Sequence, residues 1–104
     1  ATLSTSPREA IDCTRIPPDA IGLLSFHLDA QSAVDVLISE GDQTDTAPST
    51  SIWTWRHGNS ADTSGKLGEF KVDASNQIFA RRSAGTVSQF QVMSIGWRDR
   101  GVIP

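Results

Sequence analysis

Short runs of alternating apolar residues, separated by clusters of turn residues, recur along most of this chain. In residues 33–39, for example, Val34, Val36 and Ile38 fall at every second position. Successive side chains of a β-strand point to opposite faces, so this spacing predicts half-buried strands. The turn clusters recur after ~8–12 residues, which is typical of a β-sandwich or jelly roll. We therefore expect an all-β fold: an antiparallel β-sandwich, jelly-roll-like, with about seven short strands.

The expected strands span residues 9–15, 20–28, 33–39, 52–57, 67–72, 77–82 and 87–97. Between the second and third of these strands, residues 29–32 are expected to form a connection of hairpin length. Polar loops are expected at 41–51 and 58–66. Residues 1–8 are interpreted as a flexible N-terminal arm, and residues 9–104 as a single β-sandwich domain. The predicted core consists of Leu23, Phe26, Leu28, Val34, Val36, Ile38, Phe70, Val72, Ile78, Phe90 and Val92.

Composition supports this class and argues against others. The 104 residues include 22 Ser and Thr but no Tyr, and 38% are hydrophobic, which favours strands and polar loops in a globular domain. No run approaches the ~18 apolar residues of a membrane helix, so we expect no membrane insertion. A net charge of −3 lacks the basic excess of a nucleic-acid binder, so no nucleic acid is expected as a partner.

The charges are unevenly distributed along the chain. Residues 1–52 hold two basic and eight acidic residues, whereas residues 53–104 hold seven basic and four acidic residues. The simpler interpretation is that folding brings the two halves together and neutralises both. The alternative is that oppositely charged faces help copies of the protein to associate.

Patterns that support catalysis or metal binding are not evident. The chain has one cysteine, Cys13, and two histidines, His27 and His57, and it lacks a CxxC pair, a GxSxG elbow and a glycine-rich phosphate loop. We expect no enzymatic activity, no cofactor and no metal. Cys13 is expected to be a buried small apolar residue, with a reactive or intermolecular thiol as the alternative. The loop 41–45, which holds Asp42 and Asp45, is interpreted as a plain turn, with a calcium site as its alternative.

The segment Ile52-Trp53-Thr54-Trp55-Arg56-His57 is the most suggestive candidate for a ligand site. On a strand, Trp53, Trp55 and His57 would share one face, and two exposed indoles beside Arg56 would form a stacking platform for a sugar ring. The competing interpretation is that both indoles pack in the core or in a subunit interface, where each buries ~150–250 Å². If the platform is exposed, we expect the alternative function, a carbohydrate-binding or adhesin module that binds a surface glycan through Trp53, Trp55 and Arg56.

Two patches near the C-terminus are more specific than the composition. Residues 72–83 read as a strand, a turn that Asp73 can cap, and another strand. Residues 95–101 follow, with Asp99 between Arg98 and Arg100 in an arrangement suited to fixing the terminus or a neighbouring chain. Together with residues 16–21, these patches resemble small β-sandwich structural domains of tailed-bacteriophage virion proteins, with Asn76 at a position where that pattern has glycine.

The resemblance implies a non-enzymatic virion structural protein of the capsid-decoration, spike or tail-fibre type, commonly a homotrimer, that contacts other virion proteins. Its location would be the virion surface after folding in the host cytoplasm. The initial Ala1 fits removal of an initiator methionine, but a cleaved signal would leave the same start, so an extracellular location is the alternative. Self-association would bury leftover side chains, so the candidate interface comprises Met93, Ile95, Trp97, Arg98, Asp99 and Arg100.

Overall fold

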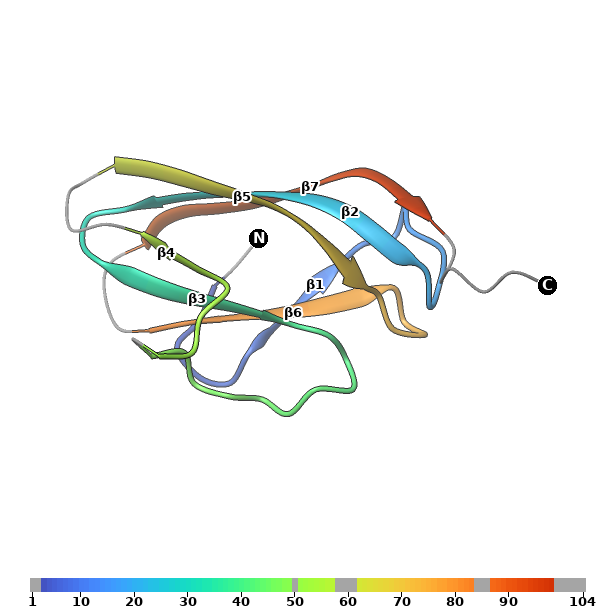
Figure 1. Ribbon diagram of the computed structural model, residues 1–104, viewed down its shortest axis with the longest axis horizontal. Coiled ribbons are helices and arrows are strands. Elements are labelled where there is room, and N and C mark those ends of the chain that lie inside the picture. The colour runs from blue at the N-terminus through green and yellow to red at the C-terminus, as the bar shows by residue number, and fades with distance from the viewer. Residues whose placement is uncertain (1–2, 50, 58–61, 84–86, 99–104) are drawn as a thin grey trace.

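The protein is an antiparallel β-sandwich of two sheets, seen in a computed structural model that describes residues 3–49, 51–57, 62–83 and 87–98 (Figure 1). One sheet has the order β1-β6-β3-β4 and the other has the order β5-β2-β7. The strands are β1 (Glu9–Asp12), β2 (Ile21–Ala30), β3 (Val34–Ser39), β4 (Trp55–His57), β5 (Asp62–Lys71), β6 (Gln77–Arg82) and β7 (Val87–Arg98). The sequence-based prediction of an all-β sandwich is therefore confirmed.

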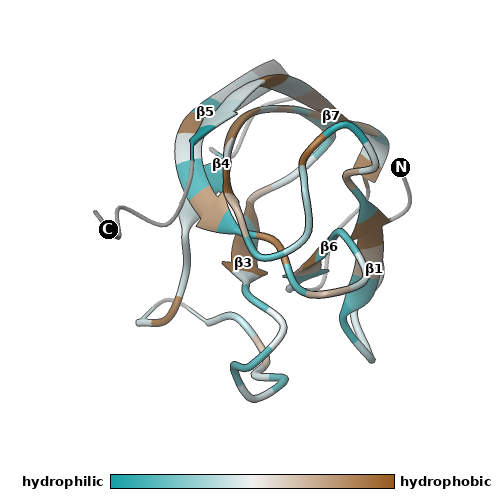
Figure 2. Ribbon diagram, turned by 90° about the vertical axis from the view of Figure 1, so that its right-hand side faces the viewer, coloured by the Kyte–Doolittle hydropathy of each residue, from teal (hydrophilic) through white to brown (hydrophobic). Residues whose placement is uncertain are grey.

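The core lies between the two sheets, which Figure 2 shows from one end of the sandwich. Along β2, the buried Leu24, Phe26 and Leu28 alternate with more exposed residues, because only every second side chain faces the opposite sheet. Val36 of β3 and Ile78 of β6 are fully buried on the opposite side of the core. Most of the predicted core is found there, and Phe70 and Val92 are partly buried against it.

Leu23 was wrongly placed in the predicted core, because its side chain is 37% exposed on the outer face of β2. The neighbouring Leu24 faces inward in its place. Two adjacent residues of a strand cannot both face the core between the sheets. The alternation with Phe26 and Leu28 places Leu24, not Leu23, on the inner face.

Several predicted strand boundaries differ from the structure. β1 ends at Asp12 rather than at residue 15, and β4 begins at Trp55 rather than at residue 52. β5 begins at Asp62, inside the predicted polar loop, because it pairs with β2 along its whole length, from Ile21↔Lys71 to Ala30↔Asp62. A strand with one exposed face carries polar residues there, and so it resembles a loop in sequence. The connection at 29–32 has the length of a hairpin, yet β2 and β3 lie in different sheets, so it crosses from one sheet to the other.

The N-terminal segment from Leu3 to Arg8 is bound to the domain rather than forming a free arm. Leu3 is buried, and the Arg82 backbone N–H donates to the carbonyl of Ser4 at 3.0 Å. The Arg82 side chain donates to the Leu3 carbonyl at 2.9 Å, and Arg81 Nε donates to the Thr5 carbonyl at 2.6 Å. These residues thus add contacts along the end of β6.

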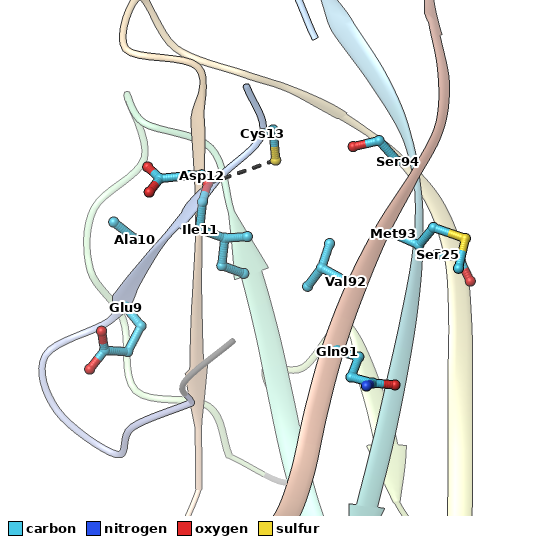
Figure 3. Close-up of a pocket in the computed structure, with 10 residues that line it drawn as sticks. All are labelled: Glu9, Ala10, Ile11, Asp12, Cys13, Ser25, Gln91, Val92, Met93 and Ser94. Carbon is cyan, nitrogen blue, oxygen red and sulfur yellow. Dashed lines mark hydrogen bonds between the residues drawn. The ribbon is translucent and has the colours of Figure 1, made fainter. Parts of the chain in front are cut away.

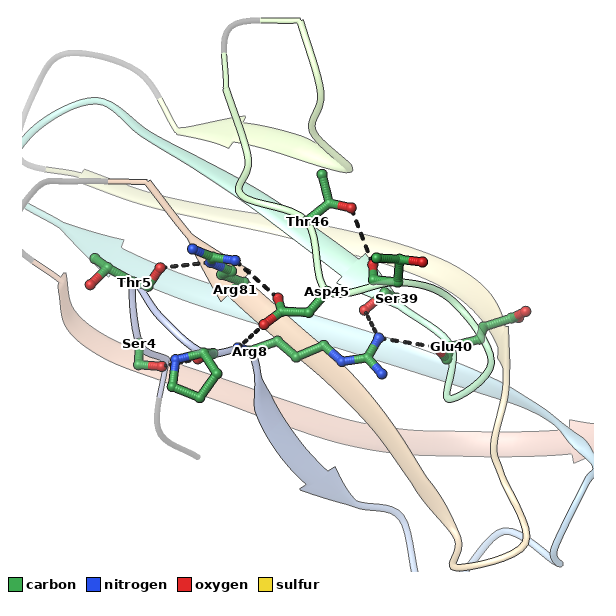
Figure 4. Close-up of polar contacts among 10 residues, drawn as sticks. Ser4, Thr5, Arg8, Ser39, Glu40, Asp45, Thr46 and Arg81 are labelled. Atoms are coloured by element: carbon green, nitrogen blue, oxygen red, sulfur yellow. Dashed lines mark hydrogen bonds and ion pairs between the residues drawn. The ribbon is translucent and has the colours of Figure 1, made fainter.

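Arg8 and Asp45 join this segment to the loop after β3, as Figure 4 shows. Arg8 donates from its guanidinium to Ser39 Oγ at 2.9 Å and from its backbone N–H to Asp45 Oδ2 at 3.3 Å. Arg81 Nη1 lies 3.1 Å from Asp45 Oδ1. Asp45 therefore serves as an ion-pair partner, and the described residues contain no group of three His, Cys, Asp or Glu side chains placed to hold a metal ion.

The turn at residues 73–76 is built by Asp73 and Asn76. Asp73 Oδ1 accepts the backbone N–H groups of Ser75 at 2.8 Å and Gln77 at 2.9 Å, as expected of a residue that caps its own turn. Asn76 has a φ of 63°, a left-handed conformation that asparagine tolerates better than most residues with a side chain. Its side-chain amide also donates to the carbonyl of Ile16, a contact that glycine would not provide.

Two ion pairs join the acidic first half of the chain to the basic second half: Asp35 with Arg56 at 2.8 Å and Asp45 with Arg81 at 3.1 Å. Both span sequence-distant segments that the sheet β1-β6-β3-β4 and its loops bring together. These contacts agree with the neutralisation expected from the charge distribution. Among the described residues, no helix is long and apolar enough to cross a membrane.

Candidate functional site

The two tryptophans of the predicted stacking platform lie in different environments. Trp55 is 6% exposed, whereas Trp53 is 45% exposed in the segment before β4. Thr54 already joins β3, since its N–H donates to the Val36 carbonyl at 2.6 Å and its hydroxyl accepts from the Ile38 N–H at 2.8 Å. The indole of Trp55 packs between the sheets against Phe26 and Phe90. The two indoles therefore do not form a shared platform at the surface.

His57 is also buried, at the same inner face of β4 as Trp55. Its Nδ1 lies 2.9 Å from Ser64 Oγ, and the same hydroxyl accepts the Trp55 indole N–H at 3.1 Å. A serine within reach of a histidine is the first requirement of a nucleophilic pair, and the sequence did not indicate Ser64 because it falls in a predicted loop. Here the hydroxyl joins two buried rings from β4 to β5, which satisfies their polar atoms.

Arg56, the remaining member of the predicted ligand site, lies on the opposite face of β4. Its Nε donates to Asp35 Oδ1 at 2.8 Å, and Asp35 is largely buried on β3. The predicted ligand set of Trp53, Trp55, Arg56 and His57 is thus divided between the core, an ion pair and an exposed loop.

A groove of about 610 Å³ opens between β1 and β7, which are the edge strands of the two sheets on this side of the sandwich. Figure 3 shows Ile11 of β1 and Val92 of β7 pointing toward one another across it. Glu9, Gln91 and Ser94 also line it. Among the described residues, β1 pairs only with β6 and β7 only with β2. The groove therefore lies between the two unpaired edges of these strands.

Cys13 lies at one end of this groove, just after β1. It is buried, as predicted, and its thiol donates to the Ile11 carbonyl at 3.7 Å. Burial raises the pKa of this thiol, and the nearby carboxylates of Asp12 and Asp73 act in the same direction, against a lowering by the backbone of Ile78. A thiol with a raised pKa is a poor nucleophile, so the geometry does not support a reactive Cys13.

Exposed apolar side chains gather on the sheet β5-β2-β7. Leu67 of β5 is 67% exposed, and Met93 and Ile95 of β7 are 68% and 60% exposed. Leu67 and Met93 both pair with Ser25, one from each side of β2, so they lie on one face. A hollow of about 410 Å³ lies between Leu23, Leu67, Glu69 and Ile95. Sequence reasoning identified Met93 and Ile95 but missed Leu67, whose odd position relative to Phe70 and Val72 marks it as outward-facing.

The remaining candidate interface residues lie at the end of β7. Trp97 is half exposed beside Ile16 and Arg15, where a small pocket forms. Arg98 Nε reaches Glu69 Oε1 of β5 at 2.7 Å, across β2. Asp99 and Arg100 lie outside the described residues.

We compared the chain with protein-family models, with curated proteins and with solved structures, and none of these comparisons gave a match.

Proposed function

We propose that this protein is a non-enzymatic structural module that assembles with copies of itself, and that it serves as a virion surface component of the capsid-decoration, spike or tail-fibre type. The observation that carries the proposal is the set of exposed apolar side chains on the sheet β5-β2-β7, namely Leu23, Leu67, Met93 and Ile95. Clustered apolar residues on a soluble domain commonly mark an interaction surface.

The energetics favour association through this surface. Burying one leucine, isoleucine or methionine side chain contributes about 1.5–3 kcal/mol. The surface offers such side chains on the three adjacent strands β5, β2 and β7. The Arg98–Glu69 pair beside them is half exposed on both sides, so it forms a polar rim and contributes little by itself. An apolar centre with a polar rim is the usual anatomy of a protein–protein interface.

Light scattering over a concentration series at low salt and neutral pH tests the assembly. We expect the mean mass to rise with concentration, and the double variant Leu67→Ser/Met93→Ser to lower it toward that of the monomer. Trp53→Ser, which removes an exposed apolar residue elsewhere, is the matched control and should leave the mass unchanged. A monomeric wild-type protein at every concentration would overturn the proposal.

The virion setting has its own test in the genes beside the coding sequence. Adjacent capsid or tail genes would support it, and a neighbourhood without them would count against it.

A further inference from the structure

The edge strand β7 differs from the other strand edges of the sandwich in having almost no charge. Residues 87–97 contain no Lys, Arg, Asp or Glu, and no proline. Exposed strand edges template pairing with other chains, and proteins usually block them with charges, prolines or short length. By this criterion β7 is an unprotected edge.

The three other edges carry such protection. β5 contains Lys66, Glu69 and Lys71, β1 has Glu9 and Asp12 among only four residues, and β4 is three residues long. β7, by contrast, is twelve residues long and pairs only with β2 among the described strands. Register irregularities near Ser88 and Ile95, a feature that also protects strand edges, interrupt its ladder at both ends, but the register from Gln89 to Ser94 between them is continuous.

Among the residues that the structure describes, none fills the space beside β7. The groove of about 610 Å³ lies between β7 and β1, so the nearest strand of the other sheet leaves the β7 edge accessible. Val92 is only partly buried and lines this groove, and an added strand would cover it.

We infer that β7 pairs antiparallel with β7 of a second copy, across a two-fold axis at Gln91, to join two three-stranded sheets into one of six strands. This inference rests on the proposed self-assembly and adds a contact at the β7 edge to the apolar face that carries that proposal. A residue on the two-fold axis lies directly opposite its own copy, where a charge would be repelled, and Gln91 and its neighbours in residues 87–97 are uncharged. With the axis at Gln91, Phe90 lies opposite Val92 of the second copy, and Gln89 lies opposite Met93 of the second copy.

The face alternation agrees with this register. Gln89, Gln91 and Met93 are exposed, whereas Phe90 is buried and Val92 is partly buried. Residues directly opposite in an antiparallel pair lie on the same face of the sheet. An axis through a residue therefore pairs exposed with exposed and inner with inner side chains.

Cysteine cross-linking in a Cys13→Ala background tests the register. Directly opposed residues have Cα atoms about 4.5–5.5 Å apart, within the range for a disulfide. Gln91→Cys is expected to form a disulfide-linked dimer on mild oxidation. Gln89→Cys and Met93→Cys alone should not, since two positions from the axis the same residue in the two copies is about 14 Å apart. A mixture of these two proteins should cross-link.

Lys66→Cys, on the charged edge β5 of the same sheet, is the control and should remain unlinked. A second variant, Gln91→Lys, should weaken the dimer at least tenfold in sedimentation, whereas Ser75→Lys, with the same change of charge in a turn, should not. Circular dichroism verifies that each variant is folded, and the cysteine series stands alone if Gln91→Lys is not.

The outcomes separate the two proposals. Association without cross-linking at Gln91→Cys, or cross-linking through Lys66→Cys, would overturn β7 pairing and leave self-assembly intact. A monomer under all conditions would overturn both.

Discussion

The ring of Phe26 lies 5.8 Å from that of Trp55, centroid to centroid, and joins the two sheets at the centre of the sandwich. Phe26 belongs to β2 and Trp55 to β4, the last strand of the other sheet. Phe70 and Phe90 complete the cluster, with centroids 5.6 and 6.3 Å from Phe26. The indole that the sequence offered as a ligand platform is thus a central element of the core.

Replacement of Trp55 should therefore be far more damaging than replacement of Trp53. We expect Trp55→Ala to lower the free energy of unfolding by about 3–5 kcal/mol, because it leaves a cavity beside Phe26 and Phe90. Trp53→Ala should change it by less than about 0.5 kcal/mol, as is usual for exposed residues. Urea unfolding at neutral pH measures both, and equal losses would contradict this placement of the two indoles.

The pair Asp45–Arg81 should contribute more than the pair Glu69–Arg98. The Arg81 side chain is largely covered and also binds the Thr5 carbonyl, whereas Glu69 and Arg98 are half exposed. A double-mutant cycle with alanines should give a coupling of about 0.5–1 kcal/mol for the first pair and less for the second. A larger coupling for Glu69–Arg98 would show that the Asp45–Arg81 pair is weaker than its geometry implies.

Asn76 should tolerate glycine better than alanine. Its φ of 63° costs a residue with a Cβ about 1–2 kcal/mol, which glycine avoids. Both substitutions remove the hydrogen bond to the Ile16 carbonyl, so we expect both to destabilise, and Asn76→Ala by about 1 kcal/mol more. Thermal unfolding of the two variants measures the difference, and the reverse order would exclude a left-handed residue 76.

Cys13 should make stability fall at alkaline pH. Burial raises the pKa of its thiol above the ordinary value of 9.0, so the folded state holds the proton more tightly than the unfolded chain. This contribution is present in full below about pH 9 and is lost as the pH rises through the folded-state pKa. The difference in unfolding free energy between wild type and Cys13→Ala should therefore shrink as the pH rises above about 9. A constant difference would show that the thiol ionises equally in both states.

The candidate site was only partly predictable. Met93 and Ile95 could be identified as outward-facing because they alternate with Phe90 and Val92 on one strand. Leu67 was missed because it was expected to be the first residue of a short strand. In the structure it lies in the middle of β5, which pairs with β2 as far back as Asp62. The edge position of β7 was not accessible from local sequence, because it depends on which strands pair with it.

By itself, the sequence determined the class of fold and several local structures. Alternation with a period of two specifies strands, so the bounds of β6 match the expected 77–82, and Asp73 specifies its own turn through contacts within four residues. Tertiary structure decided what depends on distant segments: the strand order, the burial of Trp55 rather than Trp53, and the attachment of residues 3–8 to β6. The physical reason is that alternation fixes which residues share a face, whereas only the packing of the two sheets decides which face is covered and which edge remains open.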